Sequence, residues 1–171
     1  MKKKKSFIAL ALVVAVLVLG VGYALTVIDL KVNGDITVSP DDSNFDVNFT
    51  NATVTEHGTV QGKTDEANIG DGRTATLSVK TLKTVGEKVV AEYTITNNSK
   101  AGINATLSNP IATQKDDAAK DYYTVTATLE NNAAIAPNGT KKLTVTVELV
   151  KAPLEEVTGA FEVAFNATAT K

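Results

Sequence analysis

Apolar and polar residues alternate with a period of two along most of this chain. Successive side chains of an extended strand point to opposite faces, so the pattern predicts strands with one buried and one exposed face. Turn residues separate the strands, as in Asn97-Asn98-Ser99 and Pro137-Asn138-Gly139. The alternating segments are residues 45–50, 75–80, 89–96, 103–108, 123–129, 143–149 and 161–168.

Together with a strand near the N-terminus, these segments predict eight or nine strands and an all-β fold. The expected architecture is a two-sheet antiparallel sandwich, either a jelly roll or, as the alternative, an immunoglobulin-like arrangement. A short helix is expected at residues 114–120. The polar stretch 56–73 is expected to be a long loop with at most one short strand.

The N-terminus has the three parts of a secretory signal peptide. Four lysines at residues 2–5 precede an apolar run over residues 7–19, and the small residues Gly22 and Ala24 follow. We therefore expect a signal helix in residues 1–24, cleaved by signal peptidase between Ala24 and Leu25, and a single domain over residues 25–171. The protein is then secreted, to the extracellular space or the cell surface.

The alternative is that the same segment remains uncleaved and anchors the chain. Residues 7–28 are long and apolar enough to span a bilayer. In that case the protein contacts the membrane through this segment alone.

A strand is expected directly after the signal segment, within residues 25–38. Its apolar residues have one parity and therefore share one face. Signal cleavage would leave this strand at a free N-terminus, which makes it a candidate donor strand for a neighbouring molecule. The residues of that face are Ile28, Leu30, Val32, Ile36 and Val38.

Composition and charge narrow the function. The whole chain has 17 basic and 19 acidic residues, and the signal segment holds four of the lysines, so residues 25–171 carry a formal net charge of −6. This balance argues against nucleic acid as a partner, because nucleic-acid binding needs basic patches. The chain has no cysteine, so an exported domain of this length depends on its core or its neighbours rather than on disulfides.

The sequence contains few residues that could form a catalytic or metal site. The single histidine, His57, follows Glu56 in a polar stretch, and one imidazole without cysteine does not make a typical zinc site. Oxygen ligands for calcium occur around Asp41 and Asp42 and again around Asp65 and Asp71, but neither group has EF-hand spacing. We therefore expect no enzyme activity, no cofactor and no metal.

Two stretches resemble a known family. Residues 74–99 read as a strand, then Leu82 and Gly86-Glu87-Lys88, then a strand ending in Asn97-Asn98-Ser99. Residues 143–168 supply two strands joined through a Pro-Leu-Glu-Glu segment. Both are similar to the TasA/camelysin-type exported jelly-roll proteins of Gram-positive bacteria.

This resemblance implies a subunit of extracellular biofilm-matrix fibres, in which the N-terminal strand of one copy completes the sheet of the next. Other copies of the chain are then the partners. Some members of the family are metallopeptidases, but this chain lacks a second histidine and a zinc motif. The competing interpretation is a monomeric or membrane-tethered cell-surface β-sandwich that binds a ligand without catalysis.

Overall fold

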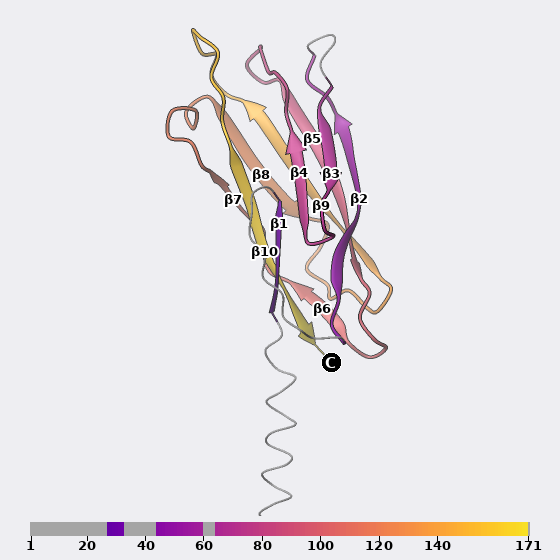
Figure 1. Cartoon of the computed structure of the whole chain (residues 1–171). Helices are drawn as coiled ribbons and strands as arrows, with labels where there is room; N and C mark the ends of the chain where they lie inside the picture. Colours follow the sequence, from indigo (N-terminus) through magenta and orange to yellow (C-terminus); the bar gives the residue numbers. More distant parts are fainter. Residues whose placement is uncertain (1–26, 33–43, 60–63, 171) are drawn as a thin grey trace, which may run out of the picture.

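The computed structural model describes residues 27–32, 44–59 and 64–170, and this part of the chain is all-β without a helix. Ten strands are described in it (Figure 1). They are β1 (Val27–Val32), β2 (Val47–Glu56), β3 (Glu66–Ile69), β4 (Thr74–Ser78), β5 (Lys88–Asn97), β6 (Asn104–Leu107), β7 (Ile111–Gln114), β8 (Tyr123–Leu129), β9 (Thr140–Leu149) and β10 (Phe161–Thr170).

The strands form two sheets. Sheet A has the order β3-β4-β1-β10-β6, with β7 also paired to β10, and sheet B has the order β2-β5-β9-β8 (Figure 1). Neighbouring strands are antiparallel except for β1 and β4, which run parallel. The expectation of purely antiparallel sheets is therefore wrong at this pair. Because β4 and β10 run in opposite directions, a strand between them must be parallel to one of the two.

The alternation in the sequence marks the buried faces correctly. In β5 every second residue is buried, with Val89, Ala91, Tyr93 and Ile95 at 0% exposure. Buried residues of β4 and β10 in sheet A and of β2, β5 and β9 in sheet B join one hydrophobic cluster. The two sheets thus share a single core, in which the Phe49 ring of β2 meets the Phe165 ring of β10 edge-on at 6.0 Å between centroids.

Strand β2 is longer than its alternation indicates. Its pairing with β5 shifts register between Phe49 and Asn51 and again between Val54 and Glu56. An extra residue in one strand of an antiparallel pair disrupts the two-residue period, so a strict pattern ends at the first shift. The short strand expected at most once within residues 56–73 is β3.

The helix expected at residues 114–120 is wrong. Gln114 ends β7, and the chain then turns, with the Ala119 and Lys120 N–H groups donating to the Asp116 carbonyl at 3.2 and 3.1 Å. Only the Lys120 bond spans four residues, as in an α-helix, and the bond from the Tyr122 N–H to the Ala119 carbonyl at 3.0 Å spans three, so residues 117–122 form turns. These turns connect β7, at the edge of sheet A, to β8, at the edge of sheet B.

A buried polar residue closes one end of the core. The Asn97 amide donates to the carbonyls of Ile103 at 3.0 Å and Ile135 at 2.8 Å, and its oxygen accepts the Ser99 N–H at 3.1 Å. Ile135 also forms an isolated bridge with Ala105 of β6. These bonds hold the β8–β9 connection against sheet A. Asn97 is fully buried, and the polar atoms of its side chain have hydrogen-bond partners, as buried polar groups usually do.

Candidate functional site

The strand from the predicted donor segment occupies the middle of sheet A. β1 pairs antiparallel with β10 from Val27 opposite Thr168 to Val32 opposite Val163, and parallel with β4 at Lys31 and Val32. In the strand order it separates β4 from β10 (Figure 1). Without β1, each of those two strands would present an unpaired edge inside the sheet. We call the position between β4 and β10 the β1 slot.

The register of β1 follows the burial of β10. Ile28 lies opposite Ala167, Leu30 opposite Phe165 and Val32 opposite Val163. Directly opposite residues of an antiparallel pair lie on the same face, and these β10 residues are buried. The three β1 positions therefore lie opposite buried positions of β10. Ile36 and Val38, like Ala24 and Leu25 at the predicted cleavage point, lie outside the described residues.

The β4 wall of the slot begins at a fixed turn. One carboxylate oxygen of Asp71 accepts hydrogen bonds from the Arg73 N–H, the Thr74 N–H and the Thr74 hydroxyl, each at 2.9 Å. The Arg73 N–H and the Thr74 hydroxyl lower the pKa of Asp71, because they favour its charged form. Gly72 has φ of +84°, a conformation that glycine adopts readily. The turn sets the start of β4 at Thr74, which is opposite Lys31.

The β10 wall is paired along its other side as well. β6 covers its C-terminal half and β7 its N-terminal half. Between them, Ser108 donates its N–H to the Asn166 carbonyl at 2.8 Å, and its hydroxyl accepts the Asn166 N–H at 2.9 Å. β10 is thus held in place by contacts that do not involve β1.

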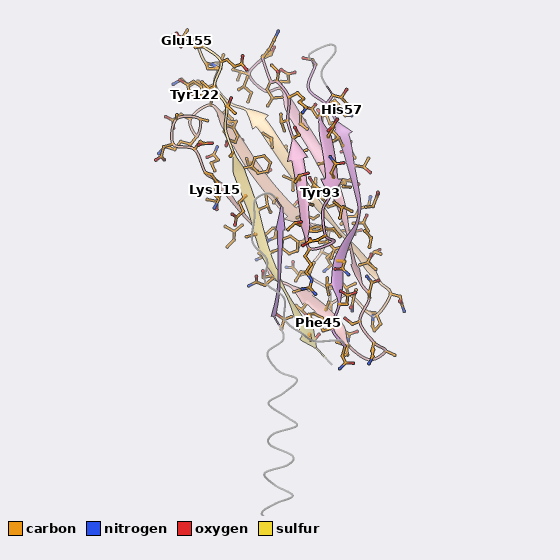
Figure 2. The ribbon with its side chains drawn as sticks, viewed as in Figure 1. Phe45, His57, Tyr93, Lys115, Tyr122 and Glu155 are labelled. Carbon is orange, nitrogen blue, oxygen red and sulfur yellow. The ribbon has the colours of Figure 1, made fainter. Side chains whose placement is uncertain are left out.

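Aromatic residues connect both walls to sheet B beneath the slot. Tyr93 packs edge-on against Phe49 at 5.8 Å between ring centroids, and Phe49 in turn meets Phe165 of β10. The Tyr93 hydroxyl donates to the Thr76 carbonyl of β4 at 3.1 Å, and burial raises the pKa of this phenol. Figure 2 shows Tyr93 in the middle of the fold. Both walls therefore have anchors independent of the strand between them.

His57, the one candidate catalytic base, lies away from the slot, beyond the end of β2 (Figure 2). Its ring is half-exposed, with Nδ1 3.6 Å from Oδ2 of the buried Asp65. The Asp65 carboxylate already accepts the Gly58 N–H at 3.0 Å and the Lys80 N–H at 2.8 Å. Asp65 therefore joins two loops, and the contact that His57 makes within the described residues is with a carboxylate and not with a hydroxyl nucleophile.

An open hollow of 380 Å³ lies beside His57, and its lining also includes Lys88 and Glu87. Burial alone would raise the pKa of Glu87, but hydrogen bonds from Thr59 and from the Lys83 and Thr84 N–H groups outweigh it and lower the pKa to about 2. Glu87 thus holds a loop together as a carboxylate. A general acid needs a raised pKa, so this group does not suit proton donation at neutral pH.

The oxygen ligands considered for calcium lie partly within the described residues. Within the described part of the chain, no group of three or more His, Asp or Glu residues is placed to hold a metal ion. Asp65 accepts the backbone N–H groups of Gly58 and Lys80, in two other loops, and Asp71 accepts those of its own turn. Asp41 and Asp42 lie outside the described residues.

Comparison with known proteins gives no relative: no family model, curated protein or solved structure matches the chain. Among the described residues, none belongs to a helix of a length and apolarity sufficient to cross a bilayer.

Proposed function

We propose that this protein is a secreted structural subunit of extracellular fibres and that it assembles by donating its N-terminal strand to a neighbouring copy. The observation that carries the proposal is the position of β1, between β4 and β10 in sheet A. In the single chain, the first described strand fills the slot. In a fibre, the same strand of the next copy would fill it.

The physical basis is that the slot cannot stay empty at low cost. Two facing rows of backbone N–H and C=O groups would lack partners, and unpaired strand edges recruit other strands. A β1 strand from another copy provides the same hydrogen bonds and the same side chains as the chain's own strand. Exchange of an identical element between copies is a low-cost route to assembly.

The core beneath the slot also supports exchange. Tyr93 holds β4, while Ser108 and Phe49 contact β10, so neither wall depends on β1 alone. A receptive slot needs such walls, because they must persist while one strand leaves and another enters. The parallel pairing with β4 covers only two positions, Lys31 and Val32, so most of the strand's ladder is with β10.

The finer fold assignment, a jelly roll of the TasA/camelysin type, is part of this proposal. Consecutive strands cross repeatedly between the sheets: β1 is in sheet A, β2 in B, β3 and β4 in A, and β5 in B. The first and last described strands are neighbours in one sheet. Both features are typical of jelly rolls.

Deletion of residues 25–32 from the secreted protein tests the proposal. Electron microscopy should show filaments for the unaltered protein and none for the deletion variant, and a synthetic peptide of residues 25–38 should bind that variant. A matched pair of substitutions refines the test. Leu30→Asp, opposite the buried Phe165, should abolish filaments, whereas Asp29→Asn, opposite the exposed Asn166, should not. Filaments from the deletion variant would refute strand donation.

A second candidate function is a monomeric or membrane-tethered surface module. It is favoured by the pairing of β1 within its own chain, because a strand that stays in place leaves nothing to donate. Mass spectrometry of the secreted protein distinguishes the two. A chain that begins near Leu25 supports a freed strand, whereas a chain that begins at Met1 would leave the strand tethered and contradict donation.

A further inference from the structure

The outer strand β8 pairs with a strand on one side only, and β7 of sheet A lies close to it without pairing. It pairs with β9 through seven consecutive residues without a register shift, from Tyr123 opposite Leu149 to Leu129 opposite Leu143. No strand of the described chain pairs with its other side. β8 contains no charged residue and no proline. It is therefore a regular, uncharged edge of sheet B, the kind of edge that recruits another strand.

The other outer strands are interrupted. β2 has two register shifts, and β3, β6 and β7 are four residues long each. β6 and β7 are divided by Asn109-Pro110 at the same edge of sheet A. Bulges, short strands and prolines are the usual means of preventing edge-to-edge association. Among the outer strands described, β8 has none of these.

The backbone of β8 shows which of its residues face outward. Leu149, opposite Tyr123, bonds to Gly86 and Glu87 on the far side of β9, so the Tyr123 backbone groups point away from β9. The Gln114 side chain accordingly donates to the Tyr123 carbonyl. Since direction alternates along a strand, the outward N–H and C=O groups that remain belong to Val125, Ala127 and Leu129.

We propose that β8 pairs with β8 of a second copy of this chain, antiparallel and with Ala127 opposite Ala127. Val125 of each copy then lies opposite Leu129 of the other, and each of these pairs exchanges two backbone hydrogen bonds. The contact is two-fold symmetric and uses the same surface on both copies. It joins the two four-stranded B sheets into one continuous sheet.

The charges around the edge fit this register. On the outer face Glu130 lies opposite Thr124 of the second copy and diagonal to its Tyr122. Lys151 Nζ is 5.3 Å from the Tyr122 ring centroid of its own copy. The Glu130 carboxylate of one copy would therefore lie near the Lys151 ammonium of the other. Symmetry repeats the pair, and no like charges are opposed within β8. On the core face, the half-buried Val125 and Leu129 cover each other.

Register-specific cross-linking tests the proposal, because the chain has no cysteine of its own. The register places Thr126 opposite Thr128 of the second copy. Both threonines are exposed, so cysteine should not disturb folding. A mixture of Thr126→Cys and Thr128→Cys proteins should form a covalent dimer under mild oxidation, at a yield several-fold above either protein alone. Denaturing gels without reductant measure that yield, whether or not filaments form.

The matched control is a mixture of Thr53→Cys and Thr55→Cys proteins, both exposed positions on the interrupted strand β2. Its yield should stay at the level expected of random collision. Equal yields for the β8 and β2 mixtures would overturn the pairing, and dimers from Thr126→Cys alone would overturn its register. β1 takes no part in the contact, so loss of filaments on deleting residues 25–32 bears on strand donation and not on this edge.

A charge exchange provides an independent measurement. Thr126→Lys/Thr128→Lys places like charges opposite each other in the pair, and so does Thr126→Glu/Thr128→Glu. Each protein alone should sediment as a smaller species than the unaltered protein, and mixing the two should restore the larger species. A general effect on folding would not be rescued by mixing, so failure of rescue counts against the pairing.

Discussion

The phenol of Tyr93, on β5 of sheet B, donates a hydrogen bond to the backbone carbonyl of Thr76, on β4 of sheet A, over 3.1 Å. The bond crosses the core and ends on a wall of the β1 slot. Tyr93 has 0% exposure, so its hydroxyl has no water to replace this partner. A side chain of one sheet therefore holds a strand of the other.

Tyr93→Phe should lower the free energy of unfolding by about 1–2 kcal/mol, because it removes one buried hydrogen bond while keeping the ring. Urea denaturation measures the loss. Tyr122→Phe is the matched control, since this ring is only half-buried and should change stability by less than about 0.5 kcal/mol. Equal effects of the two substitutions would show that the hydroxyl of Tyr93 contributes no special stability.

Asn97→Ala should be more damaging, at about 2–4 kcal/mol, because it leaves the carbonyls of Ile103 and Ile135 and the N–H of Ser99 without their partner. Thermal unfolding followed by circular dichroism measures it. The neighbouring Asn98 is exposed, so Asn98→Ala should be close to neutral. The prediction fails if the two variants melt together.

Stability should fall in acid through Glu87. Its pKa drops from an ordinary 4.5 to about 2 in the folded protein, so the carboxylate contributes stability above pH 4.5 that is lost as pH falls toward 2. Glu87→Gln should therefore be less stable than the unaltered protein at pH 7 and nearly equal to it at pH 2. Denaturant titrations across this range check the difference. A gap that stays constant with pH would contradict the proposed linkage.

Gly159→Ala should disturb the region where β10 begins. A Cβ atom there would lie 2.5 Å from Tyr123 Cε1 and 2.9 Å from Ala119 Cβ. Tyr123 donates to the Ala160 carbonyl at 2.8 Å, so its ring cannot shift without straining that bond. We expect a loss of about 1–3 kcal/mol from overpacking. The double variant Gly159→Ala/Tyr123→Leu should recover part of the lost stability, because leucine removes the ring atoms that the added Cβ would meet.

The sequence predicted most strands because their burial follows a strict two-residue period. β5 and β9 alternate over ten residues each, and both lie between two neighbours in sheet B. β7 escaped notice because its large apolar residue, Ile111, is 67% exposed and no buried apolar series marks the strand. Alternation of apolar and polar residues reflects burial of one face, so an edge strand with little burial shows only weak alternation.

The candidate site was predictable as a strand but not as a slot. The parity of Ile28, Leu30 and Val32 indicated one shared face, and these residues pair opposite buried residues of β10. No local signal indicates that the partners of this strand are β10, far along the chain, and a parallel β4. Pairing partners depend on how the whole chain is threaded. The sequence likewise did not indicate that β8 is an outer strand, because the position of a strand within a sheet depends on its neighbours and not on its own residues.

The pairing of β1 with β10 has a consequence for the proposed export and strand donation. A chain that crosses a membrane from its N-terminus delivers β1 before any other strand, yet residues 161–170 must follow before the main ladder of β1 can form. Contacts this distant along the chain are slow to close. In the proposed export, β1 would lie outside the membrane without its principal partner until β10 has crossed. The interval in which a folded neighbour could bind β1 would then depend on the time of translocation as well as on affinity.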